Sequence, residues 1–422
     1  MDILKDLQAR GLIYQSTDLD ALQDRLSKGP ITLYCGFDPT ADSLHIGHLV
    51  TVLTLRRFQL AGHHPIALVG GATGLIGDPS GRTSERTLNS REIVTEWTEK
   101  LKKQLSRFLD FESSSNPAKM VNNYDWIHSL DVITFLRDIG KNFTINSMLA
   151  KESVSSRLER GISFTEFSYM ILQAYDFYQL HEKYQCELQV GGSDQWGNIT
   201  AGTELIRRMH EEKVTVHGLT LPLITKSDGT KFGKSASGAV WLDPEKTSPY
   251  AFYQFLLNVD DHDVIKLLKV FTFLSLEEIK ELEQEVATRP EKRVAQRTLA
   301  EEVTRLVHGE EALKRAVNIT QALFHGEIRK LTAQEIAEAF QDVPSATITD
   351  HQLPLVDVLV QTGAAKSKRE AREFITNGAV TVNDVKVTDL TIKVDELDHL
   401  AGKYLVIRRG KKNYYLCELA QA

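Results

Sequence analysis

Short runs of apolar, β-branched and aromatic residues alternate with helical patterns in the first half of the chain. Three of these runs lie at 31–37, 66–69 and 187–190, and the last two lead into glycine-rich loops at 70–81 and 191–198. This alternation favours an α/β fold with a parallel sheet, in which ligands bind where loops follow the strands. We therefore predict a parallel α/β sheet with a binding site at these strand ends.

Helical patterns surround the predicted sheet. Residues 88–150 read as a helical insertion between its two halves, and apolar residues recur at helical spacing from 248 to 326. The pattern weakens at 327–352, which predicts a linker. Residues 353–422 then read as two short helices, a turn-rich strand segment and a hairpin.

Composition and charge exclude several classes of protein. The chain has 422 residues, enough for two or three domains, and a net charge of −7, so a nucleic-acid partner would need local basic patches. Its three cysteines are far apart and form no CxxC pair, which argues against a zinc ribbon or a disulfide framework. The first residues resemble no targeting peptide and no apolar run is long enough to span a membrane, so we expect a cytoplasmic protein without a membrane partner.

Two histidines, His45 and His48, follow the first predicted strand. Asp42 or Ser43 can cap the helical pattern there, which would put both histidines in the first turn on one face. Free N–H groups and the helix dipole favour an anion at that position, and imidazoles can donate hydrogen bonds to phosphate or ribose. Gly47 would leave room for a nucleotide. Taken alone, however, such a histidine pair is usually incidental.

A second segment, at 225–235, changes that interpretation. It carries Lys231 and Lys234 among glycines and hydroxyl residues. It is either a solvated loop or a mobile flap whose ammonium groups close over a polyphosphate. The glycine-rich loops match neither GxGxxG nor a Walker motif, which argues against a dinucleotide oxidoreductase and a P-loop NTPase.

Together the two segments resemble the paired signatures of class I aminoacyl-tRNA synthetases. These are the His-Ile-Gly-His motif at 45–48 and the Lys-Met-Ser-Lys-Ser loop, here Lys-Phe-Gly-Lys-Ser at 231–235. Phe232 and Gly233 depart from the generic loop but match its form in bacterial tyrosyl-tRNA synthetases. The resemblance covers nearly the whole chain. It implies that L-tyrosine reacts with ATP to give tyrosyl-adenylate and pyrophosphate, and that the tyrosyl group then passes to the 3′ end of tRNA(Tyr).

The same resemblance completes the expected architecture. It implies a Rossmann-like catalytic domain with a helical insertion at 1–223, the flap loop and an α-helical domain at 224–326, a linker at 327–352, and a small α+β RNA-binding domain at 353–422. The last is similar to a module first named from a small-subunit ribosomal protein, the S-four-like domain. A homodimer is implied as well, and Mg²⁺ carried by the ATP phosphates without a metal site in the protein.

A polar stripe on an apolar helix is the candidate amino-acid site. Residues 163–166 read as a capping box, and Tyr169, Gln173 and Asp176 share one face of the helix that follows. This face either meets solvent or lines a pocket. The resemblance implies a pocket for tyrosine, in which the phenol meets Tyr34 and Asp176, the ammonium group meets Asp78, Tyr169 and Gln173, and the carboxyl end meets Gln195.

The reaction needs in-line positioning and charge stabilisation and no protein nucleophile. By resemblance, the nucleoside of ATP is held by Cys35, Gly36, Asp38, His48, Thr51, Gly192 and Asp194. Thr40 and His45 meet the γ-phosphate, and the departing pyrophosphate is neutralised by Arg82, Arg86, Lys231 and Lys234. Arg82 departs from the lysine that is commoner at its position, which changes reach and donor geometry.

Basic residues near the C-terminus are candidate RNA contacts. Those on the second short helix are Lys366, Lys368, Arg369 and Arg372, and those in the hairpin are Arg408, Arg409, Lys411 and Lys412. They either hold RNA phosphates or form a solvated basic turn at a sheet edge. By resemblance, acceptor-arm contacts are Lys151, Arg207 and Arg208.

Two alternatives stay open at this point. A tryptophanyl-tRNA synthetase shares the fold and both signatures, although the Tyr34 and Asp176 pair and the C-terminal module favour tyrosine. A non-catalytic RNA-binding relative is the other alternative. The intact His45, His48, Lys231 and Lys234 favour the enzyme.

Overall fold

The computed structural model describes residues 2–235, 238–411 and 413–420. The chain divides into two compact units, one made of residues 1–243 and 259–299 and the other of residues 244–258 and 300–422. The helical domain predicted at 224–326 is thus divided between the two units. Among the helices of the described ranges, none is long and apolar enough to cross a membrane.

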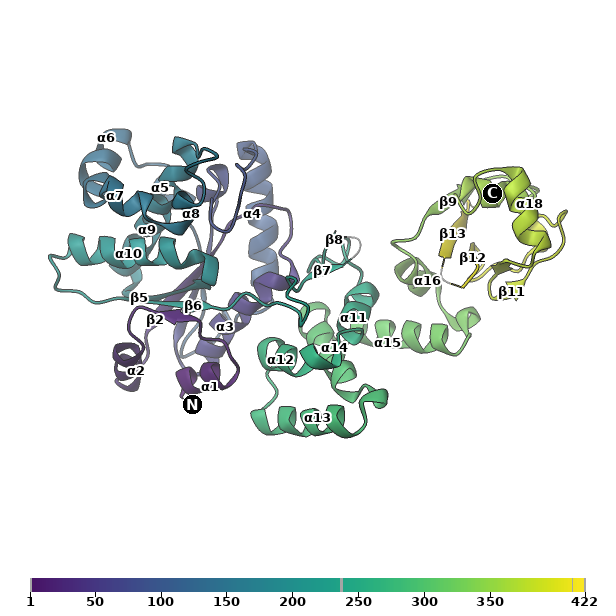
Figure 1. Cartoon of the computed structure of the whole chain (residues 1–422), viewed down its shortest axis with the longest axis horizontal. Coiled ribbons are helices and arrows are strands. Elements are labelled where there is room, and N and C mark those ends of the chain that lie inside the picture. The colour runs from purple at the N-terminus through teal and green to yellow at the C-terminus, as the bar shows by residue number, and fades with distance from the viewer. Residues whose placement is uncertain (1, 236–237, 412, 421–422) are drawn as a thin grey trace. The chain divides into compact units, whose positions relative to one another are not determined.

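A six-stranded sheet forms the centre of the first unit (Figure 1), and its strand order is β1-β6-β5-β2-β3-β4. The strands are β1 (Gln15–Ser16), β2 (Thr32–Phe37), β3 (His64–Val69), β4 (Lys119–Asn122), β5 (Cys186–Gly192) and β6 (His217–Leu221). All neighbours are parallel except β1, which pairs antiparallel with β6. The predicted parallel α/β sheet is therefore confirmed. The chain runs outward from β2 in one direction and from β5 in the other, so the crevice beyond these two strands is the expected ligand site.

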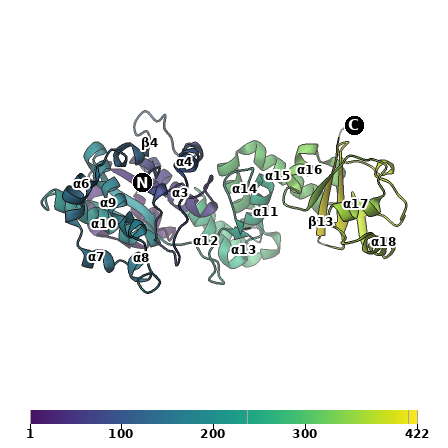
Figure 2. The same ribbon diagram turned by 90° about the horizontal axis from the view of Figure 1, so that it is seen from above.

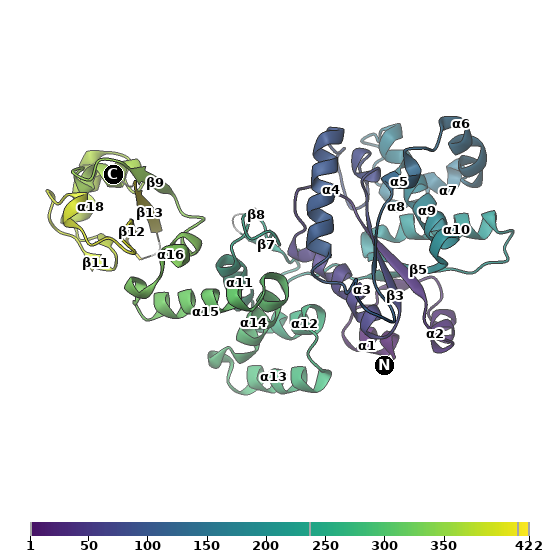
Figure 3. The same cartoon turned by 180° about the vertical axis from the view of Figure 1, so that it is seen from behind.

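Helices cover both faces of this sheet. On one face lie α3 (Leu49–Leu60) and α4 (Arg91–Leu105), and on the other α9 (Phe164–Tyr184) and α10 (Trp196–Met209), as Figure 3 shows from behind. The remaining helices assigned wholly to this unit are α1 (Ile3–Ala9), α2 (Leu19–Ser27), α5 (Tyr124–Ile127), α6 (Val132–Thr134), α7 (Ile145–Leu149), α8 (Glu152–Ser155), α12 (Asp261–Phe271) and α13 (Leu276–Thr288).

The predicted helical insertion is only partly helical. Its residues 119–122 form β4, which pairs with β3 at the edge of the sheet. A strand of four residues gives too few alternations for a period to be recognised in the sequence. This strand matters because two residues after it, Asn123 and Trp126, donate hydrogen bonds to Asp176, which lines the binding pocket.

The second unit contains a five-stranded sheet of order β11-β10-β12-β13-β9. Its strands are β9 (Ser345–Ile348), β10 (Val380–Val382), β11 (Val385–Lys386), β12 (Tyr404–Arg409) and β13 (Asn413–Leu419), and its helices are α11 (Pro249–Leu257), α15 (Glu310–Phe324), α16 (Ala333–Ala339), α17 (Leu355–Gln361) and α18 (Lys368–Thr376). The helix α14 (Val294–His308) contains the point where the division falls. Figure 2 shows β13 between α16 on one side and α17 with α18 on the other.

The predicted linker at 327–352 is structured. It contains α16 and β9, and β9 pairs parallel with β13. Ile336 of α16 and Ile348 of β9 are buried in two different apolar clusters. Since only a short segment of each element is apolar, the sequence pattern in this stretch is weak.

Candidate active site

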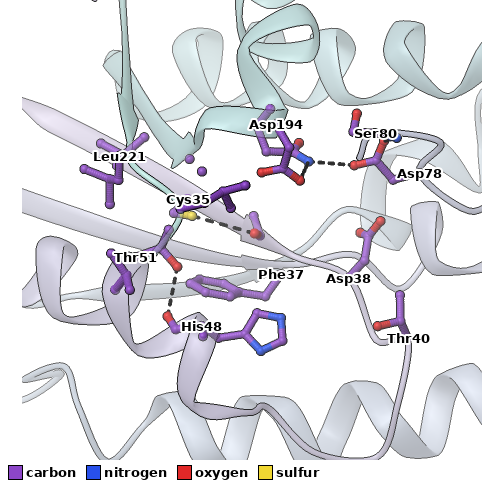
Figure 4. Close-up of a pocket in the computed structure, with 18 of the residues that line it drawn as sticks. Cys35, Phe37, Asp38, Thr40, His48, Thr51, Asp78, Ser80, Asp194 and Leu221 are labelled. Carbon is purple, nitrogen blue, oxygen red and sulfur yellow. Dashed lines mark hydrogen bonds between the residues drawn. The ribbon is translucent and has the colours of Figure 1, made fainter. Parts of the chain in front are cut away.

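A pocket of about 580 Å³ lies beyond the carboxyl ends of β2 and β5 (Figure 4). The structure brings all the predicted amino-acid, nucleotide and phosphate residues of the first unit to this one pocket. Its lining includes Tyr34, Cys35, Gly36, Asp38, Thr40, His45, His48, Thr51, Asp78, Arg82, Arg86, Tyr169, Gln173, Asp176, Gly192, Asp194, Gln195, Lys231 and Lys234.

The two histidines are arranged differently from the prediction. His45 itself is the N-cap of a short 3₁₀ turn at 46–48, and α3 begins only at Leu49. The Ser43 hydroxyl donates instead to the carbonyl of Leu44. The Nδ1 atom of His45 accepts from the Gly47 N–H at 3.1 Å, and the Nδ1 atom of His48 accepts from the His45 N–H at 3.1 Å. In a neutral ring that accepts at Nδ1, the proton is at Nε2, so both rings can donate from Nε2.

Burial keeps these histidines neutral. It lowers the pKa of His48 to about 3, with a smaller contribution from His45, and it also lowers the pKa of His45, to which Lys234 contributes. The two rings lie with their centroids 3.9 Å apart. The motif therefore offers neutral hydrogen-bond donors, and the positive charge at this side of the pocket comes from lysine and arginine.

The contacts of Phe232 and Gly233 account for the two departures of the flap loop from the generic signature. Phe232 is buried and its ring lies 5.6 Å from that of Phe271. Gly233 has a φ of +104°, and a Cβ atom there would lie 2.9 Å from Cγ2 of Ile46. A side chain at 233 would therefore be strained and would push the loop away from the histidine motif. Both lysines of the loop line the pocket.

Carboxylates gather beside Tyr169. Its hydroxyl donates to Asp38 at 2.5 Å, and Thr73 donates to the other oxygen of Asp38 at 2.6 Å. Burial raises the pKa of Asp38 to about 6, and the neighbouring Asp78 adds to the shift. The carboxylate of Asp78 accepts from Gln195 at 2.8 Å. Asp38 thus also lies beside Tyr169, a residue predicted to bind an ammonium group, while the resemblance implied that it holds the nucleoside.

The deep end of the pocket is built around Asp176. It is 2% exposed and accepts hydrogen bonds from Asn123 at 2.9 Å and Trp126 at 2.8 Å. Burial raises its pKa to about 8. The hydroxyl of Tyr34 is buried nearby and has no hydrogen-bond partner among the described residues. A buried polar group without a partner costs free energy, so this arrangement favours a ligand that brings a hydroxyl group.

Sequence reasoning missed Asn123 and Trp126. Both lie just after β4, and the Asn123 amide also supports the pocket loop by accepting from the Ala72 N–H at 2.9 Å. Recognition of β4 as a strand could have identified them, because residues that follow a strand of a parallel sheet are candidates for the binding site.

The raised pKa of Asp176 predicts a dependence of stability on pH. Between about pH 4 and about pH 8 the folded protein keeps a proton that the unfolded chain releases, so rising pH lowers the free energy of unfolding. Asp176→Asn removes this contribution. We expect the stability difference, variant minus wild type, to grow from about pH 5 to about pH 8 in thermal unfolding without substrates. Parallel pH profiles would contradict the assignment.

The loop that carries Arg82 and Arg86 is anchored by a buried ion pair. Glu166 accepts from the backbone N–H of Arg86 at 2.7 Å with one oxygen and from Arg157 at 2.9 Å with the other. The side chains of Arg157 and Glu166 are 2% and 1% exposed. Only half of the predicted capping box forms, because Ser163 accepts from the Glu166 N–H while the Glu166 carboxylate is used in this anchor. Arg157 gave no signal in the sequence, since its role depends on tertiary contacts.

Cys35 lies in the pocket as an inert thiol. It is 3% exposed, and burial raises its pKa to about 12. In Figure 4 its sulfur points to the carbonyl of Gly36, and Thr51 beside it donates to the carbonyl of His48 at 3.0 Å. The thiolate required of a nucleophile is disfavoured here.

Some of the predicted RNA contacts are exposed to solvent, whereas others are engaged in ion pairs or hydrogen bonds within the protein. Arg369 and Arg372 are exposed on α18, whereas Lys368 forms an ion pair with Asp357 at 2.5 Å. Arg409 is half-buried, donates to the carbonyl of Ala364 at 2.7 Å and covers the rings of two aromatic residues. It therefore joins the hairpin to the helices.

The remaining basic candidates also differ in exposure and in their partners. Lys366 and Lys411 are exposed, and Arg408 is half-buried beside Asp384. Lys412 lies outside the described residues. In the first unit, Arg207 and Arg208 both pair with Glu204, and Lys151 donates to Thr200.

Comparisons with known proteins agree with this geometry. The family model of class I tRNA synthetases (W and Y) matches residues 26–325, and the model of the tyrosine–tRNA ligase SYY-like C-terminal domain matches residues 335–417. A tyrosine–tRNA ligase of Desulfitobacterium hafniense is 66% identical over 99% of this chain and 100% of its own length. The chain belongs to the tyrosine–tRNA ligase family. It is therefore an aminoacyl-tRNA synthetase.

Further tyrosine–tRNA ligases support the assignment and the fold. The one from Geobacillus stearothermophilus is 63% identical over the full length of both chains. The crystal structure of a C-terminally truncated mitochondrial tyrosyl-tRNA synthetase from Aspergillus nidulans superposes with a TM-score of 0.70 at 31% identity. It covers 76% of this chain and 94% of that one.

Proposed function

We propose that this chain activates L-tyrosine with ATP to give tyrosyl-adenylate and pyrophosphate, and then transfers the tyrosyl group to the 3′ end of tRNA(Tyr). The observation that carries the proposal is the deep end of the pocket. There a buried carboxylate, Asp176, lies near the hydroxyl of Tyr34, which has no hydrogen-bond partner among the residues described. A phenol can pair with both groups, whereas the side chains of phenylalanine and tryptophan cannot supply a hydroxyl.

Different groups along the pocket pair with the phenol, the ammonium group and the carboxyl end of the amino acid, and so orient it. Its phenol meets Tyr34 and Asp176 at the buried end. Its ammonium group meets Asp78, Tyr169 and Gln173, and Asp38 adds a second carboxylate to this cradle through its hydrogen bond with Tyr169. Charge-assisted hydrogen bonds to an ammonium are stronger than neutral ones. The amide of Gln195, which donates to Asp78 at 2.8 Å, is beside the carboxyl end that attacks the α-phosphate.

ATP occupies the other half of the pocket. Its nucleoside is held by Cys35, Gly36, His48, Thr51, Gly192 and Asp194, and its γ-phosphate meets Thr40 and His45. The pyrophosphate that leaves is neutralised by Arg82, Arg86, Lys231 and Lys234. Donors that are fixed before the reaction stabilise charge as it develops, and no protein nucleophile is needed. Mg²⁺ travels with the ATP phosphates, and we assign it no protein ligands.

The proposal includes tRNA and a second copy of the chain. The exposed Arg369 and Arg372 are available to RNA phosphates in the C-terminal part, residues 353–422, and the catalytic part comprises residues 1–223 with the flap. A homodimer is supported by exposed apolar side chains of the insertion and of the start of α9, which are Val132, Ile133, Leu136, Ile145 and Phe164. The three cysteines are free, as suits the cytoplasm.

The test is exchange of pyrophosphate into ATP with the purified chain, Mg²⁺ and each of tyrosine, tryptophan and phenylalanine. Exchange with tyrosine alone supports the proposal. Exchange that depends on tryptophan would support the tryptophanyl alternative, and no exchange with any of them would contradict the catalytic roles given above.

Lys231→Ala is expected to slow adenylate formation about 10²–10³-fold, because loss of one donor to developing charge costs about 2.7–4 kcal/mol of barrier. The affinity for tyrosine should hardly change, since the lysine meets only the phosphates. Stopped-flow adenylate formation and equilibrium dialysis of tyrosine measure the two effects. Lys226→Ala, in the same loop but outside the pocket lining, is the matched control. A variant that mainly loses tyrosine binding would refute the role of Lys231.

Arg372→Ala is expected to weaken tRNA(Tyr) binding for an electrostatic reason. Loss of one phosphate contact should reduce the slope of log K against log salt by about 1. Tyrosine activation without tRNA should stay at the wild-type rate. Filter binding at several salt concentrations gives the slope, with Lys314→Ala on α15 as the control. Equal slopes for Arg372→Ala and wild type would remove this residue from the RNA surface.

A further inference from the structure

Three potential metal ligands meet outside the active site, at the ends of α9 and α10. His181 and Glu182 lie in the last turn of α9, and His210 is the C-cap of α10. One ligand atom from each of the three lies within 4.8 Å of the others. We propose that His181, Glu182 and His210 form a Zn²⁺ site that joins the ends of these two helices.

The hydrogen bonds of the cluster prepare one imidazole for a metal. Nδ1 of His181 lies 2.9 Å from the backbone carbonyl of Cys186. Since a carbonyl oxygen can only accept, the proton is at Nδ1 and the lone pair is at Nε2. A ligating histidine typically donates its other N–H to such a carbonyl, which fixes both the tautomer and the ring orientation.

The second imidazole and the carboxylate already share a proton. Nε2 of His210 lies 2.8 Å from Oε1 of Glu182, and their side chains are 29% and 41% exposed. The rings of His181 and His210 are 5.4 Å apart and nearly perpendicular. A metal that replaces this proton would take His210 and Glu182 as ligands, and the ligand atom of His181 lies within 4.8 Å of both.

The surrounding charge favours a cation. The C-terminal ends of two helices, where the helix dipole is negative, meet at this place. Nearby positive groups are already engaged, since Arg207 pairs with Glu204, Lys213 pairs with Glu211, and Lys183 covers the ring of Trp126.

The ligand set selects the metal. Two imidazoles and one carboxylate are a donor set that binds Zn²⁺ with one position left for water. The thiol of Cys186, whose carbonyl accepts from His181, is fully buried and donates to the carbonyl of Leu188, so it is not a ligand. Because α9 also carries Asp176, the metal would stabilise the helix that forms the amino-acid pocket.

The test is metal binding by the full chain after removal of metals with a chelator. Wild type is expected to bind one Zn²⁺ per chain at this site, more weakly at lower pH because the imidazoles must lose protons. Co²⁺ should give the visible bands of a tetrahedral site without a thiolate charge-transfer band. Zn²⁺ should raise the melting temperature, since it binds the folded chain.

Variants decide where the metal binds. His181→Ala and Glu182→Gln should abolish the melting shift and weaken Zn²⁺ binding strongly. Loss of an outer-shell partner typically costs about 10–100-fold in metal affinity, and loss of a direct ligand should cost at least as much. His262→Ala is the matched control, because His262 pairs with Asp260 on the surface and belongs to no such three-residue cluster among the described residues. Melting without metal checks that each variant folds. Absence of binding by wild type, or equal binding and melting shifts in His181→Ala and Glu182→Gln, would overturn the proposal.

Discussion

Asp176→Ala is expected to remove most of the preference for tyrosine over phenylalanine. In the wild type, phenylalanine leaves the buried carboxylate of Asp176 and the hydroxyl of Tyr34 without a ligand partner, whereas tyrosine pairs with them. The variant loses the bond to tyrosine and also loses the penalty against phenylalanine. A neutral hydrogen bond is worth about 0.5–1.5 kcal/mol and an unsatisfied buried group costs about 1–3 kcal/mol, so the ratio of kcat/KM values should fall about 10–10³-fold.

Pyrophosphate exchange with each amino acid measures this ratio. Discrimination of about 10⁵-fold is already known for tyrosyl-tRNA synthetases and sets the scale of what can be lost. Asp176→Asn keeps an acceptor of similar shape and should give an intermediate ratio. Gln179→Ala, on the same helix with its amide bonded to Tyr175, is the control. An unchanged ratio in Asp176→Ala would mean that another residue recognises the phenol hydroxyl.

Glu166→Ala is expected to lower the free energy of unfolding by about 3–5 kcal/mol, because it leaves the guanidinium of Arg157 buried without its main partner. The exposed partner of the same arginine provides the comparison. Glu85 lies 3.7 Å from Arg157 and is 48% exposed, so Glu85→Ala should cost no more than about 1 kcal/mol. Urea unfolding of both variants measures the difference.

The same anchor has a catalytic consequence that can be separated from folding. Glu166 holds the backbone of Arg86, so its loss should also slow adenylate formation. The double variant Glu166→Ala/Arg157→Met has no uncompensated buried charge and should regain much of the stability. It should not regain the rate of adenylate formation, because the backbone N–H of Arg86 still lacks the carboxylate of Glu166 as its acceptor. Recovery of stability and rate together would show that the anchor acts through folding alone.

The sequence predicts best what local periodicity and motif chemistry determine. The strands β2, β3 and β5 and the pocket at their ends were predictable because each strand is apolar and leads directly into a polar or glycine-rich loop. The family could be recognised because His45, His48, Lys231 and Lys234 stand at the spacing of its two signatures. All four line the pocket.

What the sequence did not predict depends on partners far away in the chain. Arg157 is buried against Glu166, and Asn123 can donate to Asp176 only because β4 joins the sheet. The expected cap by Asp42 or Ser43 does not form, because a 3₁₀ turn capped by His45 precedes α3, whose own N-cap is His48. Arg409 looked like a free charge but packs on aromatic rings of its own domain. Such pairings depend on tertiary contacts, which produce no periodic pattern of apolar and polar residues in the sequence.

The pairing of β9 with β13 determines where the C-terminal part can be separated from the rest. A fragment that begins at residue 353 lacks β9, whose residues 345–348 lie in register with residues 416–419. The outer edge of β13 would then present unpaired N–H and C=O groups to solvent, and such edges recruit other chains. An expression fragment intended for RNA-binding studies should therefore start before Ser345, because a shorter one is expected to self-associate.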